Sequence, residues 1–453
     1  MSILIGILAV VFVLGIAINI HEFGHFAVAK LLGMRVDAYS FFGLGPRIWG
    51  FKVGHTDYRI SAIPLGAYVK LYGDEGSGAL EGSDNQGEVV PQSELYELRP
   101  KWQKFLVMIG GPFMNIMLAL AIPFGFALTQ GVPATPSPIA GYVKAGGAAE
   151  QAGIKTGDRI VAFEGTESPT WQRIQNDSML SPEKEIPIIV ERNGQRIPMT
   201  IKPAKIVEGG NTLGDVEFKP ESDVLPVVVD NVQDGMPAFD AGLQKGDLIT
   251  SFNGVPVRNP EETRQRIVDN GANPIRLTIN RSGEAKEVLL NAKIDDAGKS
   301  KIGVAFSSQY AQSREKVGVA QALSYAYNSN MEILRMTGKA FGQVSKGERS
   351  AGETFSGPIG IVQIITQIAN SAGFEGLLFI LGMISLNLGV FNLLPIPMLD
   401  GGQIMVLAIE GFLGLFGLTL SMGVKEKIQM VGLAAILLLM VFTIFNDVSR
   451  FFR

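Results

Sequence analysis

The chain has 453 residues, of which 47% are hydrophobic, and a mean hydropathy of +0.24, so it is too long for one compact domain and too apolar for an ordinary soluble protein. Its net charge of −4 and pI near 5.6 provide no global basic field, which excludes nucleic acid as an expected partner. The chain contains no Cys, which rules out disulfides and thiolate metal sites and leaves His and carboxylates as metal ligands.

The first predicted element is an uncharged apolar run, from about Ser2 to Ile20, that is long enough to cross a bilayer. It lacks a basic n-region and an A-x-A-like cleavage site, so we expect a retained span. The motif H-E-F-G-H follows at residues 21–25. Positions i and i+4 share one helix face, so His21 and His25 can direct two imidazole nitrogens at one metal ion, with Glu22 as a candidate general base. A chance match is the alternative, but two of the chain's three His lie in this motif.

The segment between the first two spans is basic and rich in β-forming residues. Nine Lys and Arg lie between residues 21 and 104 and none precedes the first span, which places this segment on the cytoplasmic side. Glycine and β-forming residues concentrate between Phe42 and Tyr72, which predicts hairpin strands. Pro64 suits an edge or a break. A second span is predicted from about Phe105 to Leu128.

The middle of the chain contains two copies of the pattern A-G-[IL]-x-x-G-D-x-I at a constant offset of 89 residues, which indicates a duplicated small domain. The matching positions are Ala149, Ala152, Gly153, Gly157, Asp158, Ile160, Phe163 and Gly165, and then Ala238, Ala241, Gly242, Gly246, Asp247, Ile249, Phe252 and Gly254. Each copy, at 131–221 and 222–308, resembles the bacterial PDZ domain, a fold that binds extended peptide as an added strand. The alternative is a β-rich spacer whose glycines serve turns.

A connector, 309–370, follows the repeat. Within it, Val317 to Val344 is predicted to form an amphipathic helix, because apolar residues recur at helical spacing. These residues are Leu323, Tyr327, Met331, Leu334 and Phe341. We expect this helix to contact the membrane surface, with packing on the second repeat as the alternative. Residues 354–358 should end it, and Ile359 to Ile368 is an apolar piece too short to span.

A third metal ligand is needed, because a catalytic zinc site usually has three protein ligands and one position for water or substrate. The candidate is Asp400, in N-L-L-P-I-P-M-L-D-G-G at 392–402, which ends a third span predicted from Gly376 to Met398. The two prolines prevent a regular helix, and the Gly401-Gly402 pair lets the chain turn close to a metal. The alternative is that Asp400 caps a helix beginning near Gly402.

A fourth span is predicted from Ile428 to Phe445, preceded by Lys425 and Lys427. With the first loop cytoplasmic, the second span leads outward and the third returns. The ends of the first and third spans therefore lie on the same, cytoplasmic side. His21, His25 and Asp400 can converge there despite their separation along the chain.

The H-E-F-G-H motif, the double PDZ insert and the N-L-L-P-I-P-M-L-D-G-G motif, in this order, resemble the site-2 protease family of intramembrane zinc proteases over essentially the whole chain. The resemblance implies that His21, His25 and Asp400 bind one Zn²⁺ per chain and that Glu22 is the general base. It also implies that Asn115, from the G-x-x-x-N match at 111–115, organises the site.

For the substrate, the resemblance implies that Asn387 and Asn392 hold its backbone, and that the 42–72 region is a membrane-dipping β-sheet whose edge, between 58 and 70, receives it in unwound form. The edge residues would be Ile60, Ala62, Ile63, Gly66 and Tyr68. A cytoplasmic hairpin that only packs on the spans is the alternative.

The implied fold is a multi-domain membrane protein with an α-helical core of four spans and a β-hairpin region, built from 1–130 and 371–453, plus two tandem β-rich (α+β) PDZ domains. The implied location is the bacterial inner membrane, with the PDZ domains periplasmic and the active site near the cytoplasmic side. The implied substrates are single-span membrane proteins such as a truncated anti-sigma factor, and peptide C-termini are candidate PDZ ligands.

Two other functions compete with a protease: a membrane-anchored PDZ adaptor with a structural metal site, and a divalent-metal transporter. A structural zinc site normally has four protein ligands, and the third His, His55, lies in a polar hairpin loop where we expect it to be solvated. A transporter would carry polar residues along several spans, and these spans carry few. Both functions predict that Glu22→Gln is harmless.

Overall fold

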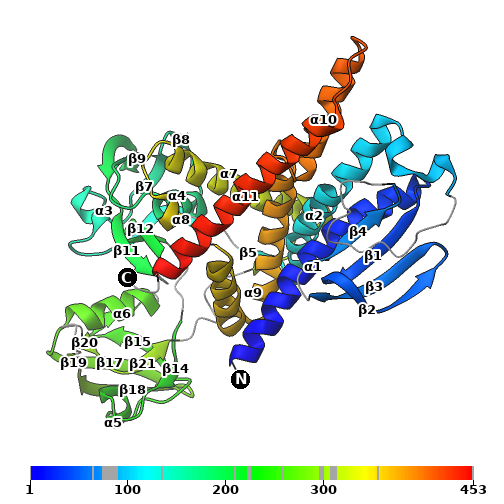
Figure 1. The fold of residues 1–453 in the computed structure, drawn as a ribbon. Helices are drawn as coiled ribbons and strands as arrows, with labels where there is room; N and C mark the ends of the chain where they lie inside the picture. The colour runs from blue at the N-terminus through cyan, green and yellow to red at the C-terminus, as the bar shows by residue number, and fades with distance from the viewer. Residues whose placement is uncertain are drawn as a thin grey trace. The chain divides into compact units, whose positions relative to one another are not determined.

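The computed structural model describes residues 2–63, 66–73, 90–133, 136–208, 211–221, 226–257, 260–294, 300–306, 314–354 and 357–450. The predicted break at Pro64 lies outside these residues, as does part of the predicted helix end at 354–358. The chain divides into two compact units, Met1–Val132 with Lys316–Arg453, and Pro133–Glu315 (Figure 1).

The first unit is mainly helical. Its helices are α1 (Ser2–Leu31), α2 (Lys101–Gln130), α7 (Val319–Ser345), α8 (Ala351–Thr354), α9 (Pro358–Asn392), α10 (Asp400–Gly414) and α11 (Met422–Arg450), with short 3-10 turns at Gln92–Glu94 and Tyr96–Leu98. Four helices in the described part of the chain are long and apolar enough to cross a membrane, within α1, α2, α9 and α11. The prediction of four apolar spans is confirmed in this sense.

The third span differs from its predicted bounds. Helix α9 ends at Asn392 and not at Met398, because Pro395 and Pro397 cannot continue a regular helix. The range from Pro358 to Asn392 consists of two helices that meet at a kink at Gly373, whose φ is 59°, and Ile359 to Ile368, predicted to be too short to span, belongs to the first of them. The short apolar piece predicted before the third span therefore lies on the N-terminal side of this kink.

Helices α1, α2 and α9 pack against one another and bury apolar side chains between them (Figure 1). The buried residues at this core are Ala9, Val13, Ala17, Ile365, Ile380 and Leu381. Helices α1 and α2 touch through backbone at Gly24, where a Cβ atom would lie 2.1 Å from the carbonyl oxygen of Gly110. Only glycine fits there, so the close approach positions the H-E-F-G-H turn directly against α2.

Helix α7 was predicted from Val317 to Val344 and forms from Val319 to Ser345. It packs on α2 through small buried residues, Ala322 and Ala326, and the amide of Asn330 donates to the Ala119 carbonyl at 3.1 Å. Most of the apolar residues that predicted the helix are exposed on it, namely Leu323, Tyr327, Met331 and Phe341. The helix is thus confirmed, and its contact with a membrane surface stays a prediction.

The first unit also contains a four-stranded sheet. The strands are β1 (Val36–Phe42), β2 (Leu44–Val53), β3 (Thr56–Ile63) and β4 (Tyr68–Leu71), in the order β2-β3-β1-β4. Strands β1 and β3 are parallel, and the other pairs are antiparallel. The hairpin strands predicted for 42–72 are present, and the sheet starts earlier, at Val36.

The predicted edge between residues 58 and 70 is wrong in its first half. Strand β3 lies between β1 and β2, and Ile60 pairs with Phe42 on one side and Trp49 on the other. Among the described residues, β2 and β4 are the outer strands. Hence Ile60, Ala62 and Ile63 belong to an inner strand, whereas Tyr68 begins an outer one.

The second unit contains two sheets with the same strand pattern, β10-β9-β7-β6-β13 and β18-β17-β15-β14-β21. The first copy comprises β6 (Ser137–Val143), α3 (Ala148–Gln151), β7 (Arg159–Phe163), β8 (Thr166–Glu167), α4 (Trp171–Met179), β9 (Ile186–Arg192), β10 (Gln195–Ile201), β11 (Ala204–Glu208), β12 (Asn211–Asp215) and β13 (Phe218–Glu221). The second comprises β14 (Val227–Val232), α5 (Pro237–Asp240), β15 (Leu248–Phe252), β16 (Val255–Pro256), α6 (Pro260–Asp269), β17 (Pro274–Arg281), β18 (Glu284–Asn291), β19 (Lys293–Ile294), β20 (Ser300–Lys301) and β21 (Val304–Phe306). Two-residue strands β5 (Val132–Pro133) and β22 (Arg314–Glu315) flank the copies.

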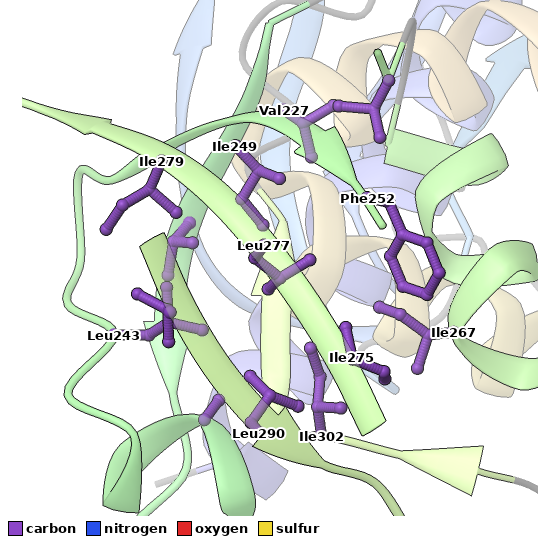
Figure 2. Packing of buried hydrophobic residues seen from close by; sticks show 14 of the residues in the cluster. Val227, Leu243, Ile249, Phe252, Ile267, Ile275, Leu277, Ile279, Leu290 and Ile302 are labelled. Carbon is purple, nitrogen blue, oxygen red and sulfur yellow. The ribbon is translucent and has the colours of Figure 1, made fainter. Parts of the chain in front are cut away.

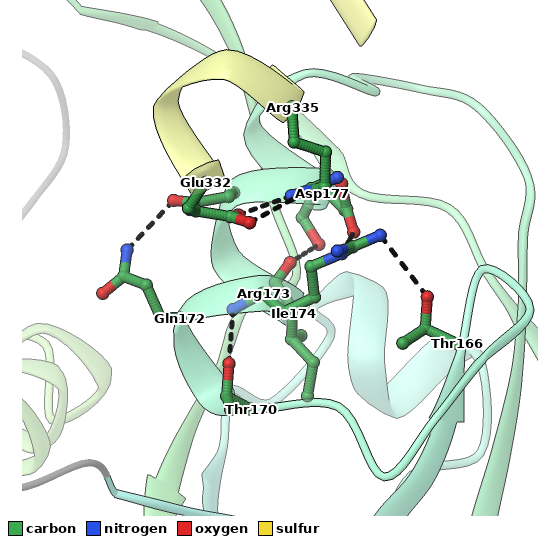
Figure 3. Close-up of polar contacts among 10 residues, drawn as sticks. Thr166, Thr170, Gln172, Arg173, Ile174, Asp177, Glu332 and Arg335 are labelled. Carbon is green, nitrogen blue, oxygen red and sulfur yellow. Dashed lines mark hydrogen bonds and ion pairs between the residues drawn. The ribbon is translucent and has the colours of Figure 1, made fainter. Parts of the chain in front are cut away.

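Each copy has its own hydrophobic core, as expected for a duplicated domain. Figure 2 shows that of the second copy, where Ile275, Leu277 and Ile279 alternate along β17 and point into the core with Phe252. In the first copy, Thr170 is the N-cap residue of α4, and its side chain accepts a hydrogen bond from the backbone N–H of Arg173 at 3.2 Å (Figure 3).

The duplication extends to a buried ion pair that the sequence pattern did not include. Asp158, whose side chain is 1% exposed, accepts hydrogen bonds from Arg192 Nε and Nη2, both at 2.6 Å. Asp247 and Arg281 repeat the arrangement at 2.6 and 2.7 Å. Burial alone would raise the pKa of each Asp carboxyl, but hydrogen bonds from the Arg and from a backbone N–H, and the positive charges nearby, together lower it below its ordinary value.

Candidate metal centre

The structure brings His21, His25 and Asp400 together. His21 and His25 lie one turn apart on α1, and their Nε2 atoms are 3.2 Å apart. Asp400 is the first residue of α10, with Oδ2 at 3.1 Å from His21 Nε2 and Oδ1 at 3.5 Å from His25 Nε2. One ligand atom from each residue lies within 4.8 Å of the others, so a single ion can reach all three.

Backbone geometry places Asp400 at this point. Between α9 and α10 the chain leaves the helix, and Met398 adopts a φ of 78°. The N-cap residue of α10 is Leu399 and not Asp400, so Asp400 begins the helix without capping it. A Cβ atom on Gly401 would lie 2.3 Å from the carbonyl oxygen of Leu393, so this turn requires glycine because of the neighbouring backbone.

His25 is oriented by a backbone carbonyl. Its Nδ1 lies 2.7 Å from the carbonyl oxygen of Val107 on α2. A carbonyl oxygen only accepts, so Nδ1 carries the proton and Nε2 keeps its lone pair for a metal. The rings also lie against Gly111, where a Cβ atom would be 2.4 Å from His25 Nε2 and 2.9 Å from His21 Cε1.

Two asparagine side chains contact His21. The amide of Asn115, which is fully buried, lies 3.3 Å from His21 Nδ1. The amide of Asn392, at the end of α9, lies 3.2 Å from His21 Nε2. Asn387 is held elsewhere, because its amide donates to the Met383 carbonyl at 3.1 Å and its oxygen accepts from Thr337 on α7 at 3.4 Å.

A cavity of about 410 Å³ surrounds the three ligands. Its lining also includes Glu22, Asn392 and, from the outer strand β4, Val69. The complete lining is Ile18, His21, Glu22, His25, Val69, Tyr96, Val107, Met108, Leu388, Asn392, Met398, Leu399, Asp400 and Gln403. The candidate base and the metal ligands therefore share a cavity with one sheet edge, and mostly apolar side chains form the rest of its wall.

Glu22 also influences Tyr39, on β1. Burial, and then the negative charge of Glu22, raise the pKa of Tyr39 to about 12. The phenol therefore stays protonated at neutral pH and serves as a donor; its hydroxyl lies 3.4 Å from the carbonyl oxygen of Asn19. Two carboxylates line the cavity, those of Asp400 and Glu22. Asp400 belongs to the ligand cluster, and Glu22 is therefore the candidate general base.

The ligand cluster fits a zinc ion. Two imidazole nitrogens and a carboxylate are a common catalytic zinc donor set. Asp400 Oδ2 is buried and accepts no hydrogen bond from the described residues. Burying a carboxylate oxygen without a partner costs free energy, and a cation bound to this oxygen would remove that cost. The cluster found among the described residues contains no fourth His, Asp or Glu. His55 is not part of the cluster. We expected it to be solvated, but its Nδ1 accepts a hydrogen bond from Arg35 Nη2 at 2.8 Å.

Comparisons with known proteins cover nearly the whole chain. The model of peptidase family M50 matches residues 9–439. The regulator of sigma-E protease RseP of Salmonella typhimurium is 30% identical over 99% of this chain and 100% of that protein. A relative from Vibrio cholerae that carries a zinc metalloprotease name is 29% identical over 99% of both chains. The solved PDZ domain of an SdrC-like protein from Listeria monocytogenes is 25% identical over 20% of this chain and 94% of its own, with a TM-score of 0.18.

Proposed function

Because the chain belongs to peptidase family M50, and is therefore a metalloendopeptidase, we propose that it is an intramembrane zinc protease that cleaves single-span membrane proteins, such as a truncated anti-sigma factor. The observation that carries the proposal is the cavity itself. It combines three metal ligands, the further carboxylate of Glu22 and a sheet edge, and it lies among helices apolar enough to span a bilayer.

The zinc implied by the family would be one ion per chain, held by His21, His25 and Asp400. When bound, zinc polarises a peptide carbonyl and lowers the pKa of a coordinated water. Val107 and Asn115 orient the two imidazoles through their Nδ1 atoms: the Val107 carbonyl contacts His25, and the Asn115 amide contacts His21. This support is what a catalytic centre needs, since outer hydrogen bonds set the tautomer and direction of each ligand.

Glu22 would act as the general base and then as the general acid. It follows His21 directly on α1, and its side chain lines the cavity. There it accepts a proton from the attacking water and returns it to the leaving amine nitrogen. Its neighbours on α1 are held by contacts to α2, so the carboxylate keeps a constant position relative to the ligands.

The substrate would bind along β4. A transmembrane helix hides its peptide bonds in its own hydrogen bonds, so it must unwind before cleavage. An outer strand offers the replacement hydrogen bonds, and β4 is outer, next to β1, with Val69 in the cavity wall. We assign this role to β4, beginning at Tyr68 and preceded by Gly66, and not to β3.

Asn392, Asn387 and Asn115 have different roles in this proposal. Asn392 would hold the substrate backbone, because its amide lies in the cavity. Asn387 bonds to Thr337 and Met383 and is absent from the cavity lining, so we give it a smaller part. Asn115 is buried behind His21 and acts on the ligand.

In cellular terms, the loop charges favour an inner-membrane protein with the metal centre near the cytoplasmic side and the tandem PDZ copies in the periplasm. There the two copies would screen substrates, by binding new peptide C-termini or by blocking bulky external domains. Helix α7, with its exposed apolar residues, would rest on the membrane surface.

The test is cleavage of a purified single-span substrate in proteoliposomes. Wild-type protein should cleave, a zinc chelator should stop cleavage, and added zinc should restore it. Glu22→Gln should reduce the rate by on the order of 100-fold or more while zinc stays bound. Glu97→Gln, at an exposed Glu outside the cavity, is the matched control and should cleave normally. Undiminished cleavage by Glu22→Gln would sink the mechanism.

A further inference from the structure

Ser385 lies on α9 behind the metal centre, fully buried and outside the cavity lining. Its Oγ is 3.0 Å from the backbone carbonyl oxygen of Asn115 and 3.2 Å from the side-chain amide of the same residue. The other end of that amide faces His21 Nδ1 at 3.3 Å. The three residues therefore form a buried chain, from Ser385 through Asn115 to His21.

The hydroxyl of Ser385 has one proton and two neighbours. The backbone carbonyl of Asn115 can only accept, so it takes that proton at the shorter distance. Towards the amide, Ser385 Oγ then has only lone pairs to offer, and the amide atom that faces it must be a donor. The favoured amide orientation thus turns Nδ2 towards Ser385 and Oδ1 towards His21.

In the structure the Asn115 amide has the opposite orientation, with Oδ1 next to Ser385 Oγ. The oxygen and nitrogen of an amide are nearly the same size, so a half-turn exchanges them while the contacts stay in place, and the hydrogen-bond partners decide between the two orientations. Only the half-turned amide accepts a proton from His21 Nδ1. His21 Nε2 then keeps its lone pair and points it at Asp400 and the cation position.

We infer that Ser385 is a positioning residue that fixes the amide of Asn115 and, through it, the His21 tautomer able to bind zinc. The inference rests on the proposed function, since it concerns the same metal centre. It also explains a difference between the two ligands. His25 faces a backbone carbonyl, which can only accept and needs no further support, whereas an amide can present either end and needs a third group to choose.

Zinc affinity of the full-length protein in detergent, by competition with a chromophoric chelator, tests the role of Ser385. Ser385→Ala should weaken zinc binding by on the order of 10-fold, the usual cost of losing an outer partner. Ser385→Thr keeps the hydroxyl and should restore the affinity. Ser371→Ala, at an exposed Ser on the same helix, should have no effect. Should Ser385→Ala fold poorly, Ser385→Cys keeps the size with a much weaker donor and acceptor.

A spectroscopic measurement separates this role from simple packing. The chain has only three His, so ¹⁵N-histidine labelling gives a small set of imidazole signals. In the zinc-loaded wild type, His21 should carry its proton on Nδ1 alone. In Ser385→Ala, a second population of His21, protonated on Nε2 and not bound to zinc, should appear when zinc is limiting, while His25 is unchanged.

A double-variant comparison gives the sharpest outcome. A carboxylate has two equivalent oxygens and no orientation to choose, so in the Asn115→Asp background Ser385→Ala should leave zinc affinity unchanged. Equal zinc affinity for wild type and Ser385→Ala, or an equal loss in both backgrounds, would overturn the role of Ser385 alone. A wild-type protein that binds no zinc would overturn the proposed function as well.

Discussion

Replacing Gly111 by alanine should damage the metal centre while leaving the rest of α2 intact. The new Cβ atom would lie 2.4 Å from His25 Nε2 and 2.9 Å from His21 Cε1. Nonbonded carbon and nitrogen atoms rest at about 3.5 Å, so the overlap with His25 is roughly 1 Å. The ring cannot simply move away, because its other nitrogen is bound to the Val107 carbonyl at 2.7 Å. Overpacking of this kind costs about 1–3 kcal/mol, and here it acts on a metal-ligating atom.

The assay is zinc affinity together with thermal unfolding of the purified protein. Gly111→Ala should weaken zinc binding by on the order of 100-fold, equivalent to about 2.7 kcal/mol. Gly125→Ala is the matched control on the same helix, because no atom lies within 4 Å of its added Cβ. It should keep the zinc and gain up to about 1 kcal/mol of helix stability. Wild-type zinc affinity in Gly111→Ala would refute the packing of the imidazole rings against α2.

Two further predictions concern other parts of the chain. Since the Asp158 pKa lies below its ordinary value, the pair with Arg192 stabilises the first copy of the duplicated domain at neutral pH, and this stability is lost as pH falls below about 4 through the lowered pKa. Arg192→Leu removes the guanidinium that lowers this pKa, so the loss of stability on acidification, followed by circular dichroism, should be smaller than in the wild type; an unchanged pH profile would contradict the assigned cause. Asn392→Ala should lower kcat/KM by on the order of 100-fold with zinc retained, and Asn387→Ala by much less. Equal losses for the two would remove Asn392 from substrate binding.

The metal ligands could be predicted from sequence because ionisable residues next to apolar spans are rare. His21, His25 and Asp400 stand out against their surroundings, and the parity of the spans places them on one side. The partners of these ligands carry no such signal. Val107 acts through its backbone carbonyl, which every residue has, and Ser385 looks like any small residue in a membrane helix.

The sheet edge was mispredicted for a topological reason. Reading strands in chain order assumes that neighbours pair in sequence, but β1 and β3 pair in parallel, which puts β2 outside and β3 inside. No local sequence pattern in residues 42–72 predicts this parallel pairing of β1 with β3. The buried pairs Asp158–Arg192 and Asp247–Arg281 are different, since both partners obey the 89-residue offset and a longer comparison of the two copies would have found them.

The glycines explain why the cavity opens where it does. At Gly24 the backbones of α1 and α2 leave no room for a Cβ, which would lie 2.1 Å from the Gly110 carbonyl oxygen, and at Gly111 the helix surface is filled by the ligand rings. At these two positions there is no room for a side chain, so α1 and α2 pack closely beside the metal ligands. The rest of the cavity wall comes from Val69 on β4, from Tyr96, from Leu388 and Asn392 on α9, and from the segment between Met398 and Gln403. If the substrate binds along β4, as we propose, an extended peptide at the metal centre lies between Val69 of the sheet edge and the start of the helix that carries Asp400.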